Sequence, residues 1–282
     1  MSESGIRKFE KIAPLLGCPL CGNALAPQNG ASLVCIKGHC FDVAKKGYVN
    51  FAPQKKRRMY EAALFESRQR AFLAGFYETP LQALCEVAAR HIGTTTPVLV
   101  DAGCGEGYYA LGIRRFFGEE AEVFGLDIEK DAIHLAARGG NDVKWLVADL
   151  SRIPLKDGCV DAVFNIFSPA NYAEFRRVLK QNGIVVKAVP GEHYLTEIRQ
   201  AAAEQLKSSA YSPARVADHF EEHLTAVDRA YVKNTFPVTH AQLLDFLTLT
   251  PMMFGVDTAK LKTEDIHEIT IDVEVLVGVY RC

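Results

Sequence analysis

Apolar and polar positions follow two different periods along most of the chain, and segments with one period alternate with segments with the other. Short runs of β-branched and aromatic residues predict buried strands, and stretches with apolar residues three or four positions apart predict helices. Strands are expected at 98–101, 122–128, 143–150, 160–169 and 183–190, and helices at 108–117, 129–138, 171–181 and 194–208. This alternation predicts a Rossmann-like α/β fold with a mainly parallel sheet.

Both ends of the chain add to this unit. Residues 60–75 and 80–91 have helical periodicity before the first strand. After the last strand, the stretches 224–236 and 266–281 alternate like strands, on either side of a helix expected at 239–249. We expect the two stretches to close the sheet as an antiparallel pair, which gives seven strands and fits a methyltransferase better than a dehydrogenase.

The first strand ends in a glycine-rich turn, VLVDAGCGEGYYALG, in which Gly103, Gly105 and Gly107 precede a helix. Glycine is needed where the chain reverses in little space and where a ligand must lie against the backbone. The spacing is G-x-G-x-G, whereas G-x-G-x-x-G favours a pyrophosphate at the helix N-terminus. The carboxylate of Glu106 inside the turn would repel a pyrophosphate but could hold an ammonium group or a ribose hydroxyl.

These features favour S-adenosylmethionine, which carries an ammonium and a sulfonium but no phosphate. A nicotinamide or flavin nucleotide and an ordinary strand–helix turn are the alternatives. Ligands of open parallel sheets bind outside the carboxyl ends of the strands, where Asp127 could accept ribose hydroxyls and Asp149 could meet an adenine amino group. The expected cofactor site consists of Gly103, Gly105, Glu106, Asp127, Asp149, Asn165 and His193.

Composition and charge narrow the class of protein. The chain has 282 residues, of which 49% are apolar and 23% charged, as in a globular protein. No apolar run approaches the roughly 20 residues of a membrane span, and no signal peptide is recognised, so we expect a cytoplasmic protein. Residues 1–60 carry a charge balance of +7 and the remainder −9. The basic segment could meet a polyanion or could simply be a solvated surface.

Four of the eight cysteines lie close together, in GCPLCGNALAPQNGASLVCIKGHCF. Two short knuckles of this kind supply two ligands each for a tetrahedral Zn²⁺, and the metal stabilises a module too small to fold on its apolar core alone. Cys18, Cys21 and Cys35 are expected ligands, and the spacing leaves His39 or Cys40 as the fourth.

The following segment, FDVAKKGYVNFAPQKKRR, interleaves cations with aromatic residues. Cations neutralise phosphates and aromatic rings stack on unpaired bases, so the segment suits RNA. Tyr48 and Phe51 could equally form the small core of the zinc module. We expect a zinc-binding, RNA-recognising part at 1–52, a linker with helices at 53–95 and a methyltransferase domain at 96–282.

Over nearly its full length the chain resembles the RlmA family, bacterial enzymes that methylate N1 of a guanine in a hairpin of 23S ribosomal RNA. The resemblance rests on CPLC, FDVAKKGYVN, AGFY, DAGCGEGYY and PGEHYL. IFSPANYAEFRRVL, HFEEHL and EVLVG are similar to the Gram-positive, type II branch of the family, some of whose members protect against macrolides such as tylosin.

The resemblance implies a homodimeric, S-adenosylmethionine-dependent rRNA (guanine-N1)-methyltransferase with a small zinc-ribbon-like domain, and a contribution to macrolide resistance. It favours His39 as the fourth zinc ligand, because family members carry a polar residue at the position of Cys40. It implies cofactor contacts from Tyr77, Gly105, Glu106 and His193.

The guanine pocket is expected at the end of the strand 160–169, shaped by Asn165, Ser168 and Pro169, where no side chain is an obvious general base. The target base must be unpaired or flipped out to reach it. Two other functions stay open. A methyltransferase of small molecules would not need the basic zinc module, and a non-catalytic zinc RNA-binding protein would not need the intact acidic residues of the cofactor site.

Overall fold

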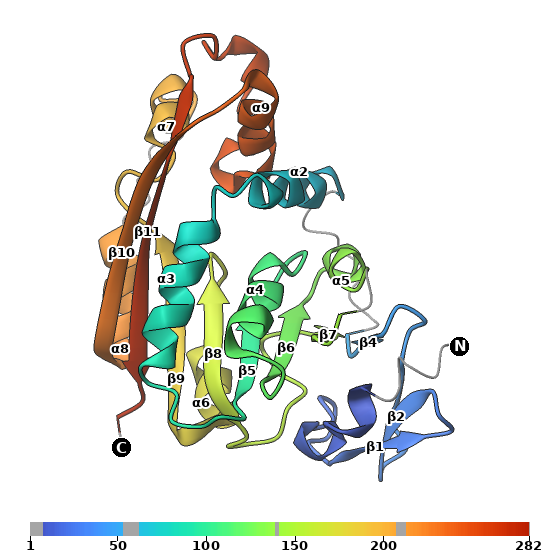
Figure 1. The fold of residues 1–282 in the computed structure, drawn as a ribbon. Coiled ribbons are helices and arrows are strands. Elements are labelled where there is room, and N and C mark those ends of the chain that lie inside the picture. Colours follow the sequence, from blue (N-terminus) through green and yellow to red (C-terminus); the bar gives the residue numbers. More distant parts are fainter. Residues whose placement is uncertain (1–7, 53–61, 139–140, 207–212, 282) are drawn as a thin grey trace.

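The computed structural model describes residues 8–52, 62–138, 141–206 and 213–281. Its main element is a sheet in the strand order β10–β11–β9–β8–β5–β6–β7–β4 (Figure 1). The strands are β4 Tyr48–Asn50, β5 Val98–Ala102, β6 Glu122–Asp127, β7 Lys144–Val147, β8 Val160–Ile166, β9 Leu179–Pro190, β10 Thr225–Pro237 and β11 Glu268–Val279. Strands β4 to β9 run parallel, and β10 and β11 add to β9 as the antiparallel pair expected from the sequence.

Seven of these strands come from residues 96–282, which confirms the Rossmann-like fold class. The eighth strand, β4, comes from the N-terminal segment and pairs in parallel with β7. The sheet of the described residues therefore has eight strands instead of seven, and part of the segment 1–52 belongs to the body of the protein.

Helices cover both faces of the sheet and its upper edge. The helices are α2 Ala62–Leu73, α3 Glu78–Ala89, α4 Tyr108–Phe117, α5 Lys130–Ala136, α6 Tyr172–Val178, α7 Thr196–Ala201, α8 Pro213–His223 and α9 His240–Leu249, with short 3₁₀ turns η1 Ala13–Leu15, η2 Pro251–Met253 and η3 Thr258–Lys260. One apolar cluster joins α3 and α4 to one face, and a second joins α6 and α8 to the other. Figure 1 shows α2 and α9 lying together above the upper ends of the central strands.

Helix α8 was not predicted from the sequence, and α7 is shorter than predicted. Phe220 of α8 and Leu224 just after it are both buried, and their spacing of four residues is typical of a helix. α7 ends at Ala201, well before the expected end at 208. The helix after α2 also begins earlier than expected, at Glu78. Among the described residues, no helix has the length and apolar character that a membrane crossing requires.

The strand order reverses between β5 and β8. β6 and β7 follow β5 on one side, while β8 and β9 lie on the other. Such a switch point opens a crevice at the carboxyl ends of the strands, because the connections leave in opposite directions. The glycine turn after β5 and the segment after β8 therefore meet at one place.

The N-terminal residues form a small antiparallel sheet of β1 Leu25–Gln28, β2 Ser32–Cys35 and β3 Cys40–Asp42 beside the β4 edge (Figure 1). It is joined to the connection between β7 and β8, where the amide of Gly17 donates to the carbonyl of Pro154 at 3.2 Å. Leu16 forms a β-bridge with Leu155, and both side chains are buried. The small sheet is thus packed against the main body.

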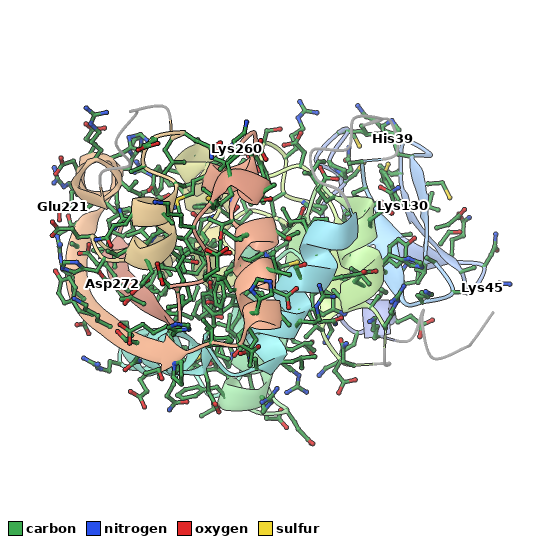
Figure 2. All side chains as sticks on the ribbon, turned by 90° about the horizontal axis from the view of Figure 1, so that it is seen from above. His39, Lys45, Lys130, Glu221, Lys260 and Asp272 are labelled. Atoms are coloured by element: carbon green, nitrogen blue, oxygen red, sulfur yellow. The ribbon has the colours of Figure 1, made fainter. Side chains whose placement is uncertain are left out.

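The aromatic residues of this region are core residues. Phe41, Tyr48 and Phe51 are each at most 8% exposed, and the rings of Phe41 and Phe51 lie 4.8 Å apart. Tyr48 and Phe51 pack within the apolar clusters of the core, so of the two interpretations the one as core residues is confirmed and the one as base-stacking residues is wrong. Lys45 remains exposed, at the opposite end of the molecule from Glu221 (Figure 2).

Candidate active site

The glycine turn is packed between two strands. Gly103 has φ +84°, and a Cβ there would lie 2.0 Å from the Ser168 hydroxyl oxygen, which follows β8. The amides of Gly103 and Cys104 both donate to the carbonyl of Leu126 in β6. Gly103 is therefore required by the close approach of Ser168. A Cβ on Gly105 would meet the guanidinium of Arg68, from α2, at 3.4 Å.

Glu106 is a buried carboxylate in this turn. It is 5% exposed, and neither of its oxygens has a hydrogen-bond partner among the described residues. Its ionic neighbour is Arg68, whose Nε lies 3.5 Å from Oε2. Burial raises the pKa of Glu106, and the positive charge of Arg68 opposes that rise. Because buried polar atoms are nearly always paired in native proteins, this carboxylate is suited to a cationic ligand group.

Asp101, at the end of β5, is a second buried carboxylate. Its Oδ2 atom lacks a hydrogen-bond partner among the described residues. Burial, and then the charges of Asp127 and Glu106, raise the pKa of Asp101 to about 8. The negative potential around the turn favours a ligand that brings positive charge.

Asp127 and Asp149 lie where the sequence placed them, at the carboxyl ends of β6 and β7. Asp127 accepts hydrogen bonds from the amides of Gly105 and Glu129, both at 2.8 Å, which fix its carboxylate beside the glycine turn. Asp149 accepts one from the amide of Ser151 at 2.9 Å. A carboxylate has about four lone-pair sites, so each can still accept bonds from a ribose or an adenine.

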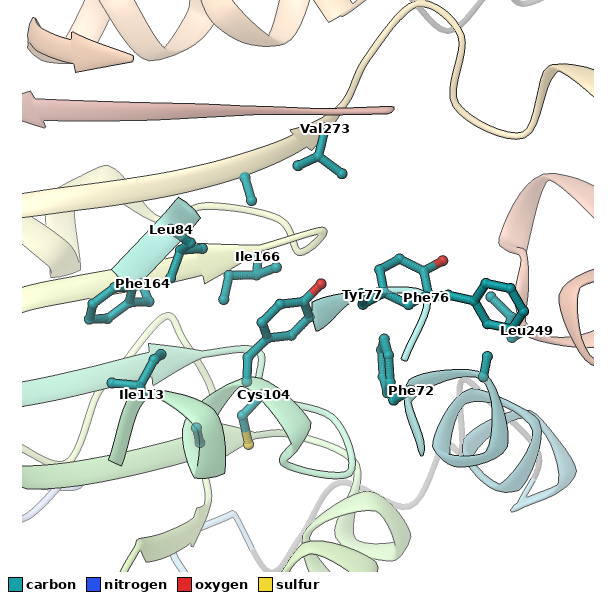
Figure 3. Packing of buried hydrophobic residues seen from close by; sticks show 14 of the residues in the cluster. Phe72, Phe76, Tyr77, Leu84, Cys104, Ile113, Phe164, Ile166, Leu249 and Val273 are labelled. Carbon is teal, nitrogen blue, oxygen red and sulfur yellow. The ribbon is translucent and has the colours of Figure 1, made fainter. Parts of the chain in front are cut away.

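A cavity of about 400 Å³ opens beside the turn, between the ends of β8 and β9 and the helices α2 and α9. Its wall includes four aromatic side chains, Phe72, Tyr77, Phe167 and Tyr194. The hydroxyls of Tyr77 and Tyr194 lie 2.6 Å apart. Figure 3 shows Phe72 and Tyr77 together near Leu249 of α9. This volume is in the range of small-molecule and base pockets.

The segment after β8 contributes to this cavity in a different way from that expected. Ser168 and Pro169 line it. Asn165 is fully buried and donates to the carbonyls of Ala102 at 3.0 Å and Pro169 at 3.1 Å. Asn165 therefore holds the ends of β5 and β8 together, and it is not among the residues that line the cavity.

Two further expected residues differ in their surroundings. Tyr77 is only 2% exposed and lines the cavity, and burial raises the pKa of its hydroxyl well above the ordinary value. His193 is exposed and is not among the lining residues, although its amide donates to Asp272 at 2.7 Å. Its neighbour Tyr194 lines the cavity instead.

Three cations that the sequence did not predict line the cavity, and Arg68 and Lys187 are two of them. Lys187 left a signal, because it interrupts the apolar strand IVVKAVP at a position that the sheet buries to 5% exposure. Arg68 left none, since basic residues are common on helix surfaces and only the tertiary structure brings α2 over the turn.

The four expected zinc ligands converge. The ligand atoms of Cys18, Cys21, Cys35 and His39 all lie within 4.8 Å of one another. The Sγ atoms of Cys21 and Cys35 are 3.6 Å apart, and the Nδ1 atom of His39 lies 3.5 Å from Cys18 Sγ and 3.4 Å from Cys35 Sγ. A tetrahedron with metal–ligand bonds of about 2.0–2.3 Å has edges of roughly 3.3–3.8 Å, so these residues fit Zn²⁺. Cys40 is exposed and is not part of this group.

Two family models match separate parts of the chain. Residues 16–59 match a family described as RlmA, N-terminal, and residues 99–183 match a methyltransferase domain. A Bacillus subtilis protein provisionally named as a 23S rRNA (guanine-N1)-methyltransferase is 35% identical over 272 residues, covering 93% of this chain and 95% of its own. The 23S rRNA (guanine(748)-N1)-methyltransferase of Streptomyces fradiae is 29% identical and covers 94% of this chain and 96% of its own.

Solved structures support the fold. A Haloferax volcanii complex of the Trm112 methyltransferase activator with a provisionally assigned methyltransferase contains a chain that matches with a TM-score of 0.51 at 17% identity, covering 80% of this chain and 100% of that one. The glycine turn, its acidic neighbours and the four metal ligands thus occur together in a chain similar over its length to the named relatives. The protein therefore belongs to the RlmA family of methyltransferases, as the sequence resemblance indicated.

Proposed function

We propose that this protein transfers the methyl group of S-adenosylmethionine to N1 of a guanine in 23S ribosomal RNA. The relatives from Bacillus subtilis and Streptomyces fradiae carry this activity in their names. The observation that carries the proposal in the structure is the aromatic-walled cavity of about 400 Å³, which is lined by Ser168 and Arg68, the residues that lie against Gly103 and Gly105 of the glycine turn. A methyl donor on the turn would therefore face a space in which a planar base can stack.

The residues at the turn match the polar groups of the cofactor. Glu106 offers the ammonium group of the cofactor a carboxylate that has no hydrogen-bond partner among the described residues, and Arg68, its ionic neighbour, offers a guanidinium for the carboxylate of the cofactor. Asp127 and Asp149 remain the proposed partners of the ribose and the adenine, and Tyr77 and His193 stay predictions from the family resemblance. The bound cofactor supplies a methyl group on a sulfonium, which is already a good leaving group.

The contribution of the protein is then mainly placement. Orientation of two reactants can supply as much as about 7–11 kcal/mol of a barrier. The rings of Phe72 and Tyr77 can hold the guanine, while Ser168 and Pro169 limit its position from the β8 side. A base reaches such a cavity only when it is unpaired or extruded, so we propose the loop of a hairpin as the target.

We propose that the zinc module contributes to RNA binding through exposed cations such as Lys45 and Lys46. The basic run 55–58 lies outside the described residues. A Cys18→Ser/Cys35→Ser variant should lose RNA affinity and keep cofactor affinity. Unchanged RNA affinity after loss of the metal would refute this role.

The type II branch, a homodimer, a cytoplasmic location and a contribution to macrolide resistance remain proposals. The oligomeric state follows from light scattering of the purified protein. The resistance role follows from macrolide sensitivity of a strain with and without the gene.

The main experiment maps reverse-transcription stops on 23S ribosomal RNA from strains with and without the gene. N1 methylation blocks base pairing, so a stop should appear at one guanine and disappear with the gene. In parallel, purified protein is given methyl-labelled cofactor with either unmodified 23S ribosomal RNA or a panel of metabolites. Labelling of a metabolite and none of the RNA would show that the enzyme is a small-molecule methyltransferase.

A further inference from the structure

Lys187 is a buried lysine at the carboxyl end of the sheet. It lies in β9, is 5% exposed and lines the aromatic cavity. Its Nζ atom donates to Asn165 Oδ1 at 2.6 Å and to the carbonyl of Ser168 at 3.2 Å. None of the ion pairs found among the described residues includes it. Buried lysines are ordinarily paired with a carboxylate, so an unpaired one beside a ligand cavity calls for an explanation.

The orientation of the Asn165 amide is fixed by its neighbours. Its Nδ2 group donates to the carbonyls of Ala102 and Pro169, so its Oδ1 atom must be the acceptor that faces Lys187. Apart from its bond to carbon, Nζ has three tetrahedral positions. Two of them are therefore occupied by N–H groups that point at acceptors. In a neutral amine the third position is the lone pair, and no further hydrogen bond of Nζ is found among the described residues, although Lys187 lines the cavity.

Burial also favours the neutral amine. It lowers the pKa of Lys187 to about 8, because the ammonium form loses hydration and gains no opposite charge. At neutral pH roughly one molecule in ten then carries a neutral amine, against fewer than one in a thousand for an ordinary lysine.

No other side chain that lines the cavity is suited to accept a proton at neutral pH. The titratable groups there are Arg68 from α2, Arg199 from α7, Tyr77 and Tyr194. Arginine stays protonated, and burial raises the pKa of both tyrosines, so their hydroxyls stay neutral. On the neighbouring strands, Asn165 of β8 and Leu276 of β11 lie opposite Lys187.

We propose that Lys187 is the catalytic base that accepts the N1 proton of the target guanine. This rests on the proposed function, since guanine N1 carries a proton at neutral pH that must leave. As N1 forms a bond to the methyl carbon, the bond between that carbon and sulfur breaks and its electron pair stays on sulfur. The N1 proton passes to the amine of Lys187, which becomes an ammonium and returns the proton to water between turnovers.

The first test is a single-turnover pH profile of methyl transfer to unmodified 23S ribosomal RNA. For the wild type the rate should rise about tenfold per pH unit below pH 8 and level off above it. Lys187→Arg keeps the positive charge and the donors but cannot be a base, and Lys187→Met removes both. In each variant the rate should fall about 100-fold or more, and the break in the pH profile near pH 8 should disappear. The cofactor affinity of each variant, measured by calorimetry, should stay within about twofold of the wild type.

The matched control is Lys180→Met. Lys180 lies at the other end of the same strand, is exposed and forms an ion pair with Asp161 at 2.8 Å. The rate and pH profile of this variant should equal those of the wild type. A Lys187→Arg rate within threefold of the wild type, or a variant profile that keeps the break, would overturn the assignment. A wild type that methylates no ribosomal RNA would instead show that the proposed function is wrong.

A second readout does not depend on turnover. In protein labelled with ¹³C at the lysine ε-carbons, the resonance absent from the Lys187→Arg spectrum belongs to Lys187. It should titrate near pH 8, and a midpoint in the ordinary lysine range near 10.4 would exclude the base. The comparison with the variant spectrum is needed because burial also lowers the pKa of Lys8 to about 8.

Discussion

Replacing Arg68 with methionine should weaken cofactor binding while leaving the fold intact. In the protein without cofactor, Arg68 lies above Gly105 and balances the buried Glu106, 3.5 Å from Oε2. With cofactor bound, the ammonium group can take over Glu106 and Arg68 can meet the carboxylate. When the cofactor binds, the guanidinium of Arg68 is thus expected to leave the carboxylate of Glu106 and pair with the carboxylate of the cofactor.

The expected size of the loss follows from this exchange. A hydrogen bond to a charged group contributes about 1.5–3 kcal/mol, which corresponds to roughly 10- to 150-fold in Kd. Loss of Arg68 also leaves Glu106 without a cation in the free protein, and the incoming ammonium relieves that cost. We therefore expect a loss near the lower limit, about tenfold for Arg68→Met, and a larger one for Glu106→Gln.

The assay is calorimetric titration with S-adenosylhomocysteine, the product that keeps both charged ends. Gln69→Met is the matched control, because it is the next residue of α2 and is exposed. The double variant Arg68→Met/Glu106→Gln separates the two explanations. If both residues hold the cofactor, it should bind at least as weakly as either single variant. Recovery of wild-type affinity would mean that the two residues serve only each other, and the reasoning would be wrong.

Three further outcomes are expected. Burial raises the pKa of Asp101 to about 8, so the folded protein holds a proton that the unfolded chain has lost, and stability should fall as pH rises from about 4 to 8. Asp101→Asn should remove this fall in melting temperatures of the cofactor-free protein. Cys35→Ser should abolish zinc binding in metal analysis, whereas Cys40→Ser should keep one equivalent, because Cys40 is exposed and outside the ligand group. Gly118→Ala should cost about 1–3 kcal/mol of unfolding free energy, since its backbone angles (φ +81°, ψ −175°) lie in a region open essentially to glycine alone, while nothing lies within 4 Å of the added Cβ. Gly103→Ala should cost more, because its Cβ would also lie 2.0 Å from a hydroxyl oxygen, and equal losses would refute the packing argument.

The order of elements in the parallel part could be predicted because each strand there is buried on both faces. Runs such as VLVDA of β5 are buried along their whole length and apolar except for Asp101, and the helices between them keep a clear period. α4, predicted at 108–117, has these bounds in the structure. The edges were harder, since β4 is only three residues long and its residues Tyr48 and Val49 pack in two different apolar clusters.

The residues of the site also differ in whether a local sequence pattern or long-range packing places them. Residues at the end of a strand, such as Asp127 in β6, were predictable, because the topology alone sends the strand ends to one edge. Arg68 depends on how α2 lies across that edge, and no local pattern encodes such long-range packing. Asn165 shows the converse. It lies at the end of β8, as predicted, but its amide is hydrogen-bonded to Ala102 and Lys187, and only the tertiary structure shows these partners.

The zinc module and the cofactor site are linked through the sheet, and this affects how a metal-depleted protein must be interpreted. The segment that carries Cys35 and His39 continues into β4, which pairs with β7, and β6 separates β7 from the strand that leads into the glycine turn. Cys18 and Cys35 also belong to the same apolar cluster as Leu155. Loss of zinc should therefore loosen the β4 edge first and reach the turn only through two intervening strands. A metal-free protein that loses RNA binding with normal cofactor affinity fits this arrangement, whereas parallel loss of both would mean that zinc supports the sheet as a whole and that its effect on RNA is indirect.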